Sequence, residues 1–126
     1  MQNLPKDLEM KDKMRIVQEL GPGRQITIAH IIANPDPILY QKMGLDPKLD
    51  YTHAAIGILT VSPAETAVIT ADIALKNAGV ELGFVDRFSG TLIITGTVSE
   101  VESAFYAIAD YFRDKLHFAV CDVTKT

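Results

Sequence analysis

The chain has 126 residues, which suits a single domain with a core large enough to be stable without disulfides. Its one cysteine, Cys121, excludes an intrachain disulfide, and no Cys/His cluster has the spacing of a metal site. The net charge is −4 and the 12 Lys and Arg residues are scattered, so we expect no nucleic-acid partner. Without a signal peptide or a long apolar segment, we also expect no membrane partner and a place in the reducing cytosol.

Hydrophobic residues make up 48% of the chain, whereas charged residues make up 22%. This balance is slightly more apolar than a monomer of this size needs. It favours surface buried between subunits, although a monomer with a rich core has the same composition.

The N-terminal residues fall into two parts. Residues 1–13 are polar, mixed in charge and without periodicity, which predicts a flexible tail. Residues 14–23 alternate in polarity and end in Gly-Pro-Gly, which predicts a short strand and a turn. Such a strand either joins the subunit's own sheet or pairs with copies from other subunits. The main domain is then expected over residues 24–126.

The first elements of the main domain are a strand and a short helix. Residues 25–32 alternate as a mostly buried strand does. Asn34 can cap a helix that has Pro35 as its first residue and ends at Gly44. A buried strand is predicted over residues 54–61, and its Gly57 permits a close backbone approach.

The second helix has clear signals at both ends. Ser62, Pro63 and Glu65 predict a capping box with a proline at the first helical position, and Gly79 ends the helix. One stripe of this helix consists of small residues that allow close packing, namely Ala64, Ala67, Ala71, Ala74 and Ala78.

The remaining pattern predicts two strands, a helix and a closing strand. Residues 80–85 and 91–96 form an antiparallel hairpin through a short loop. Ser99 and Glu102 predict a second capping box, and the helix runs to about residue 115. Its apolar face holds Val101, Phe105, Ile108 and Phe112. A last strand is expected over residues 117–123.

From Ala54 onward, this order is strand, helix, strand, strand, helix, strand, which is the α+β ferredoxin-like arrangement. One extra strand and helix precede it. The same arrangement serves sensors, enzymes, RNA binders and assembly subunits, so it does not by itself define a function.

Candidate catalytic residues are few. Cys121 beside Asp122, or Ser89 with a distant histidine, has no recognisable nucleophile motif. We therefore expect no catalytic residue, no metal and no cofactor. Asp86 and Arg87 are interpreted either as an ion pair that stabilises the loop or as functional loop residues. Lys76, near a helix C-terminus, is by default a solvated lysine.

Three separated segments resemble one known family. They are RIVQELGPGRQITIAHIIANP (15–35), AIGILTVSPAETAVITADIALKNAGVELGFVDRFSG (55–90) and CDVTKT (121–126). These segments are similar to the circularly permuted shell proteins of ethanolamine- and propanediol-utilisation bacterial microcompartments, with a choline-utilisation relative as another option. The resemblance covers residues 14–126 and implies a ferredoxin-like shell domain whose terminal strand and helix have moved to the front.

The resemblance also implies a function and its residues. The protein would be a non-enzymatic shell subunit that forms homohexamers, tiles with other shell proteins and encloses enzymes, which are themselves candidate partners. The loop Asp86, Arg87, Phe88, Ser89 and Gly90 would surround the hexamer axis. A strand of Arg15, Ile16, Val17, Gln18, Glu19 and Leu20 would form a small β-barrel on that axis with its symmetry mates.

The edge of the hexamer would be marked by Lys76, with Asn34 and Pro35 at a second edge position where ordinary shell proteins have arginine before the proline. The competing hypothesis is an oligomeric ferredoxin-like regulatory domain that binds a metabolite between subunits. A small enzyme is the third hypothesis.

Overall fold

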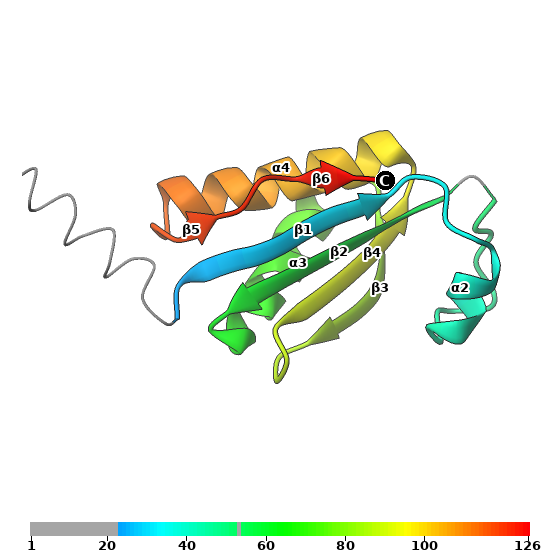
Figure 1. Cartoon of the computed structure of the whole chain (residues 1–126), viewed down its shortest axis with the longest axis horizontal. Coiled ribbons are helices and arrows are strands. Elements are labelled where there is room, and N and C mark those ends of the chain that lie inside the picture. Colours follow the sequence, from blue (N-terminus) through cyan, green and yellow to red (C-terminus); the bar gives the residue numbers. More distant parts are fainter. Residues whose placement is uncertain (1–22, 53) are drawn as a thin grey trace, which may run out of the picture.

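The computed structural model describes residues 23–52 and 54–126. Within them, a mixed sheet has helices α3 and α4 on one side, while α2 lies at one end (Figure 1). The elements in chain order are β1 (Gln25–Ile32), α2 (Ile38–Lys42), β2 (Ala55–Ser62), the 3-10 turn η1 (Ala64–Thr66), α3 (Ala67–Asn77), β3 (Glu81–Asp86), β4 (Thr91–Gly96), α4 (Val98–Asp114), β5 (Ala119–Val120) and β6 (Thr124–Lys125).

The sheet has the strand order β3-β4-β2-β1-β5, and β6 also pairs with β1. β1 lies antiparallel to β2, in the place that the last strand of a simple ferredoxin-like unit would take. This order confirms the α+β ferredoxin-like class. The permutation itself remains an interpretation of the resemblance.

The closing strand over residues 117–123 was predicted as continuous, and this is wrong. The structure has two separate two-residue strands, both parallel to β1. The reason is that β1 already occupies the edge of β2, so the terminal segment only reaches the outer edge of β1. There His30 bonds through its two ring nitrogens to the hydroxyls of Thr124 (2.6 Å) and Thr126 (2.9 Å).

The main core lies between the sheet and the two long helices. Val101, Phe105, Ile108 and Phe112 of α4 are fully buried, as their helical spacing predicts. A Cβ on Gly57 would lie 2.6 Å from Val101 Cγ1 and 2.8 Å from Phe105 Cζ. The close approach predicted at this glycine is therefore confirmed, and it is α4 that approaches.

The small-residue stripe is confirmed along most of α3. Ala67, Ala71 and Ala74 are buried, whereas Ala64 and Ala78 at its two ends are partly exposed. This stripe brings α3 close to its neighbours in the core. On the outer side of the helix, Val68 and Leu75 remain about half exposed.

The predicted start of α2 is wrong, because the helix begins at Ile38 and not at Pro35. A residue that precedes proline is disfavoured in the helical conformation, so Pro37 keeps Asp36 out of the helix. The Asp36 carboxylate instead accepts the Ile38 N–H at 3.0 Å. Asn34 therefore lies in the preceding loop.

Neither predicted capping box forms. Ser62 ends β2, and the Thr66 N–H donates to the Pro63 carbonyl (3.0 Å), which makes a 3-10 turn before α3; the Thr66 hydroxyl donates to the same carbonyl (2.6 Å). At α4, Thr97 is the cap: the Glu100 N–H donates to its hydroxyl (3.1 Å), and the Thr97 N–H donates to the Glu100 carboxylate (2.9 Å). The box thus lies two residues earlier than predicted.

Candidate functional site

The loop between β3 and β4 is organised by Asp86. Its carboxylate accepts the Phe88 N–H at 2.9 Å, and its carbonyl accepts the Gly90 N–H at 2.9 Å. The hydrogen bond from the Phe88 backbone, followed by one from the Ser89 side chain, lowers the pKa of Asp86 below the ordinary carboxyl range. The negative charge is therefore directed into the loop's own turn.

Arg87 and Phe88 form the tip of this loop. No direct ion pair joins Asp86 and Arg87 in the part of the chain that the structure describes, and the charge of Arg87 is the last of several causes that lower the pKa of Asp86. The Arg87 guanidinium lies 4.9 Å from the centroid of the Phe88 ring, within cation–π range. The Phe88 side chain is 80% exposed. The tip thus presents a cation stacked on an aromatic ring to the outside.

Gly90 fixes the loop to the body of the domain. Its φ is +77°, a left-handed conformation that side chains disfavour, and a Cβ would overlap the Val61 carbonyl oxygen. The Val61 N–H donates to the Gly90 carbonyl at 2.9 Å. The tip therefore has a defined position at the end of β2, β3 and β4.

Lys76 lies in the last turn of α3, as predicted, with its side chain 71% exposed. Its ammonium is 2.9 Å from the Asp72 carboxylate one turn earlier. Both residues line an open groove of about 580 Å³ between α3 and α4, whose floor includes Ile73 and Ala107. The lysine is oriented by its own helix and directed away from the core.

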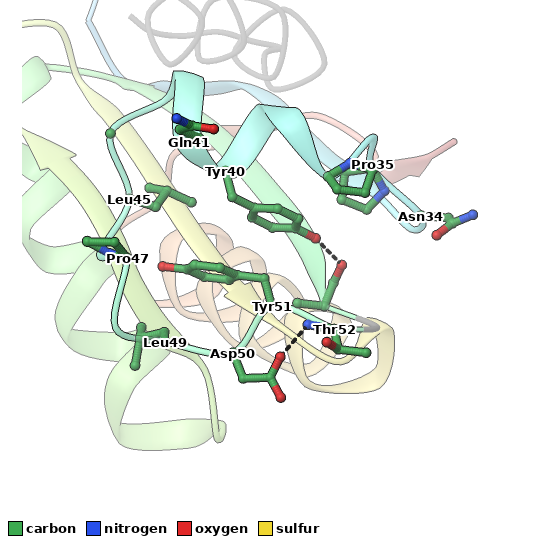
Figure 2. Close-up of a pocket in the computed structure, with 13 residues that line it drawn as sticks. Asn34, Pro35, Tyr40, Gln41, Leu45, Pro47, Leu49, Asp50, Tyr51 and Thr52 are labelled. Atoms are coloured by element: carbon green, nitrogen blue, oxygen red, sulfur yellow. Dashed lines mark hydrogen bonds between the residues drawn. The ribbon is translucent and has the colours of Figure 1, made fainter.

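Asn34 and Pro35 lie elsewhere, at the far end of the sheet. They line an open pocket of about 930 Å³ beside α2 (Figure 2). Lys76 lines a different surface depression, so the structure does not bring the predicted edge residues of one subunit together. The pocket was not predicted, although three prolines and two tyrosines between residues 35 and 51 mark its position in the sequence.

Two tyrosines hold this pocket together. The rings of Tyr40 and Tyr51 are stacked, with centroids 4.5 Å apart (Figure 2). The Tyr40 hydroxyl donates to the Ala54 carbonyl (2.6 Å), and the Tyr51 hydroxyl donates to the Asp46 carbonyl (2.9 Å). Both hydroxyls are used internally, and burial raises the pKa of Tyr40. The tyrosines therefore support the segment that follows β1.

Other predicted features have simpler outcomes. Residues 15–20 lie outside the described residues, and their barrel strand remains a prediction.

Cys121 is partly buried, and burial raises the pKa of its thiol, which favours the unreactive protonated form. Over residues 23–52 and 54–126, no group of three metal-ligating side chains and no helix long and apolar enough to cross a bilayer is present.

Comparison with known proteins gives the family. Residues 55–123 match the BMC domain. The chain is 44% identical over 112 residues to the bacterial microcompartment shell protein PduU of Salmonella typhimurium, covering 89% of this chain and 93% of that protein. It is 45% identical over 115 residues to the shell protein EutS of Escherichia coli, and this match covers 91% of this chain and 99% of that protein.

A solved structure described as the CutR flat hexamer matches with a TM-score of 0.76 and 41% identity, over 89% of this chain and 99% of that one. The chain belongs to the family of bacterial microcompartment shell proteins with a BMC domain. Shell proteins of this family are structural and not enzymes. The matched BMC domain begins at the first residue of β2 and leaves out β1 and α2. The alternative of a metabolite-binding regulatory domain is not supported by these relatives.

Proposed function

We propose that this protein is a structural subunit of a bacterial microcompartment shell. Six copies form a ring, and rings tile edge to edge with other shell proteins into a layer that encloses metabolic enzymes and limits the diffusion of metabolites. The observation that carries this proposal is the similarity, over 89% of the chain, to a protein solved as a flat hexamer.

The loop of residues 86–90 is proposed to surround the axis of the ring. Support comes from its position at one end of the sheet, its anchorage at Gly90 and the exposure of Phe88. A pore lining must keep its shape without help from a ligand, and the internal hydrogen bonds of Asp86 provide that rigidity. The strand over residues 15–20 is proposed to form a β-barrel above the same axis, which would obstruct passage.

Lys76 is proposed to contact the adjacent ring. Its exposed side chain and its ion pair with Asp72 place a cation on the outer side of α3 in a restricted orientation. An exposed pair at this helical spacing adds only about 0.3–0.5 kcal/mol to the stability of the subunit. Assembly, and not folding, is then the property that depends on Lys76. Asn34 and Pro35 are proposed for a second edge contact on the surface beside α2.

The first experiment is the mass of the purified protein by light scattering after size exclusion, followed by electron microscopy at high concentration. A mass near six subunits, with sheets or tubes, is expected. A stable monomer or dimer, or a trimer that responds to a metabolite, would contradict the proposal.

The matched test of the edge is Lys76→Ala against Arg113→Ala, which removes an equal charge and an exposed ion pair with Asp110 from α4. Lys76→Ala is expected to leave the hexamer mass and thermal midpoint unchanged while raising severalfold the concentration at which sheets appear. Arg113→Ala should assemble as the parent does. Equal assembly of both variants would remove Lys76 from the edge.

A further inference from the structure

The tip of the loop between β3 and β4 carries a positive charge that is not paired within the subunit. Over residues 23–52 and 54–126, which the structure describes, Arg87 forms no ion pair. Its guanidinium lies over the Phe88 ring instead, 4.9 Å from the ring centroid. A guanidinium cannot be deprotonated in a folded protein. The tip is therefore a permanent cation.

Two carboxylates lie near this cation, and neither forms an ion pair with it. Asp86 is the last residue of β3, and its carboxylate accepts a backbone N–H of its own turn at 2.9 Å. Glu65 belongs to η1, which lies beside the loop, because a Cβ on Gly90 would be 3.1 Å from the Ala64 Cα atom. Arg87 itself is exposed. The negative charge of the loop thus lies at its base, and the positive charge lies at its tip.

The position of the cation is restricted by its surroundings. The loop lies at the turn of the hairpin of β3 and β4 (Figure 1). The Gly90 N–H donates to the Asp86 carbonyl and the Val61 N–H donates to the Gly90 carbonyl, both at 2.9 Å. Stacking on Phe88 limits the directions in which the Arg87 side chain can point. A group that is already oriented loses less conformational entropy when it binds a ligand.

The symmetry of the proposed ring multiplies this charge. With the loop of residues 86–90 around the axis, six copies of Arg87 surround one point. Six like charges around an axis repel one another, so an anion at their centre stabilises the ring. Rings of arginine or lysine attract anions, and the low-dielectric protein around them strengthens the attraction. The anion that fits best carries several negative charges and accepts several hydrogen bonds.

We propose that the ring of Arg87 side chains is a binding site for a multiply charged phosphate anion on the hexamer axis. Phosphate oxygens accept the paired N–H groups of a guanidinium, and linked phosphates carry more charge than a single carboxylate. This step rests on the proposed function, which places the loop at the axis. One anion then serves six subunits, so the ligand stabilises the ring.

The test measures binding of inorganic pyrophosphate to the hexamer by isothermal titration calorimetry at low salt. We expect one anion per six chains and an affinity that falls as the salt concentration rises. Arg87→Gln should weaken binding about tenfold or more, because it removes all six charges from the axis. Arg113→Gln, which removes an exposed charge from α4, should bind as the parent does.

The stoichiometry separates a site on the axis from a site on each subunit. One anion per chain, or equal binding by Arg87→Gln and the parent, would overturn the inference. Equal affinity for acetate and pyrophosphate would overturn it as well, because the site is proposed to select multiple charge.

Thermal unfolding gives a second readout. Pyrophosphate is expected to raise the thermal midpoint of the parent and not that of Arg87→Gln. Because Arg87 has no ion pair within the described residues, this variant should fold and keep the hexamer mass by light scattering. Arg87→Lys keeps the six charges and should retain part of the binding. Loss of all binding in Arg87→Lys hexamers together with normal binding in Arg87→Gln hexamers would overturn the inference.

Cross-linking between subunits tests the axis separately. Ser89→Cys in a Cys121→Ser background is expected to cross-link within the ring. If rings cross-link and do not bind pyrophosphate, the inference fails and the axis placement stands. If intact rings do not cross-link, the axis placement fails, and the inference fails with it.

Discussion

The two faces of the sheet are built differently. The face under α3 and α4 carries a continuous core, in which Phe105 and Phe112 are the largest fully buried side chains. The opposite face has a cluster of three buried residues, Tyr40, Leu45 and Ile56, held by a ring stack and hydrogen bonds. Burial of apolar area is the main source of folding free energy, so the helix-covered face determines whether the subunit folds. The other face buries little apolar area, and Ile28 and Phe84 on it remain about half exposed.

The largest expected effect tests the helix-covered face. Phe105→Ala should lower the free energy of unfolding by about 3–5 kcal/mol, because it leaves a cavity beneath α4. Urea unfolding followed by circular dichroism measures it. Tyr106→Ala, at the next position and 54% exposed, should cost less than about 0.5 kcal/mol. A similar cost for both variants would contradict the assignment of Phe105 to the core beneath α4.

Gly57→Ala tests how closely α4 approaches the sheet. The added methyl group would contact Val101 and Phe105 too closely, so we expect a loss of about 1–3 kcal/mol. Gly23→Ala adds the same group where no atom lies within 4 Å, and should be nearly neutral. Thermal unfolding of the two variants compares them directly, and a neutral Gly57→Ala would mean that the helix can move aside.

Tyr40→Phe tests the opposite face. It removes the hydroxyl that donates to the Ala54 carbonyl and should cost about 1 kcal/mol, less than either change on the helix-covered face. Tyr111→Phe, on the exposed side of α4 and 44% exposed, serves as the control and should be neutral. A cost above that of Phe105→Ala would reverse the order of the two faces.

The smallest expected effect concerns the loop of residues 86–90, between β3 and β4. The pKa of Asp86 is lowered in the folded protein, so its stabilisation of the turn is complete above the ordinary carboxyl range and is lost as pH falls through the lowered value. The Phe88 amide resonance should therefore shift at a pH below about 3.9. An Asp86→Asn variant should show no such shift. A midpoint above that value in the parent would contradict the assigned hydrogen bonds.

The sequence predicted most of the regular structure, because the alternation of apolar and polar residues follows from burial on one face. The bounds of β1 and β4 agree with the prediction, since each is an alternating apolar run between polar residues. The start of α4 was missed because Thr97–Glu100 and Ser99–Glu102 are overlapping boxes of equal quality in the sequence. The split of the last strand was missed because it depends on β1, which is distant in the chain.

The candidate site was predicted less completely. Resemblance identified the loop of residues 86–90, but the partners of its charges depend on side-chain orientation: Asp86 bonds to its own turn, and Arg87 lies over Phe88. The exposure of Ile28 and Phe84 has no signature in the sequence either. Each lies beside a shift in strand register, which depends on the pairing with a neighbouring strand.

The central position of β1 has a consequence for synthesis of the chain. His30 and Thr124, which are paired across β1 and β6, are 94 residues apart, so one edge of β1 stays without its partner while those residues are made. At about 5–20 residues per second, this takes roughly 5–19 seconds. During that interval the nascent chain carries an unpaired strand edge, which is a surface on which a strand of another chain can pair.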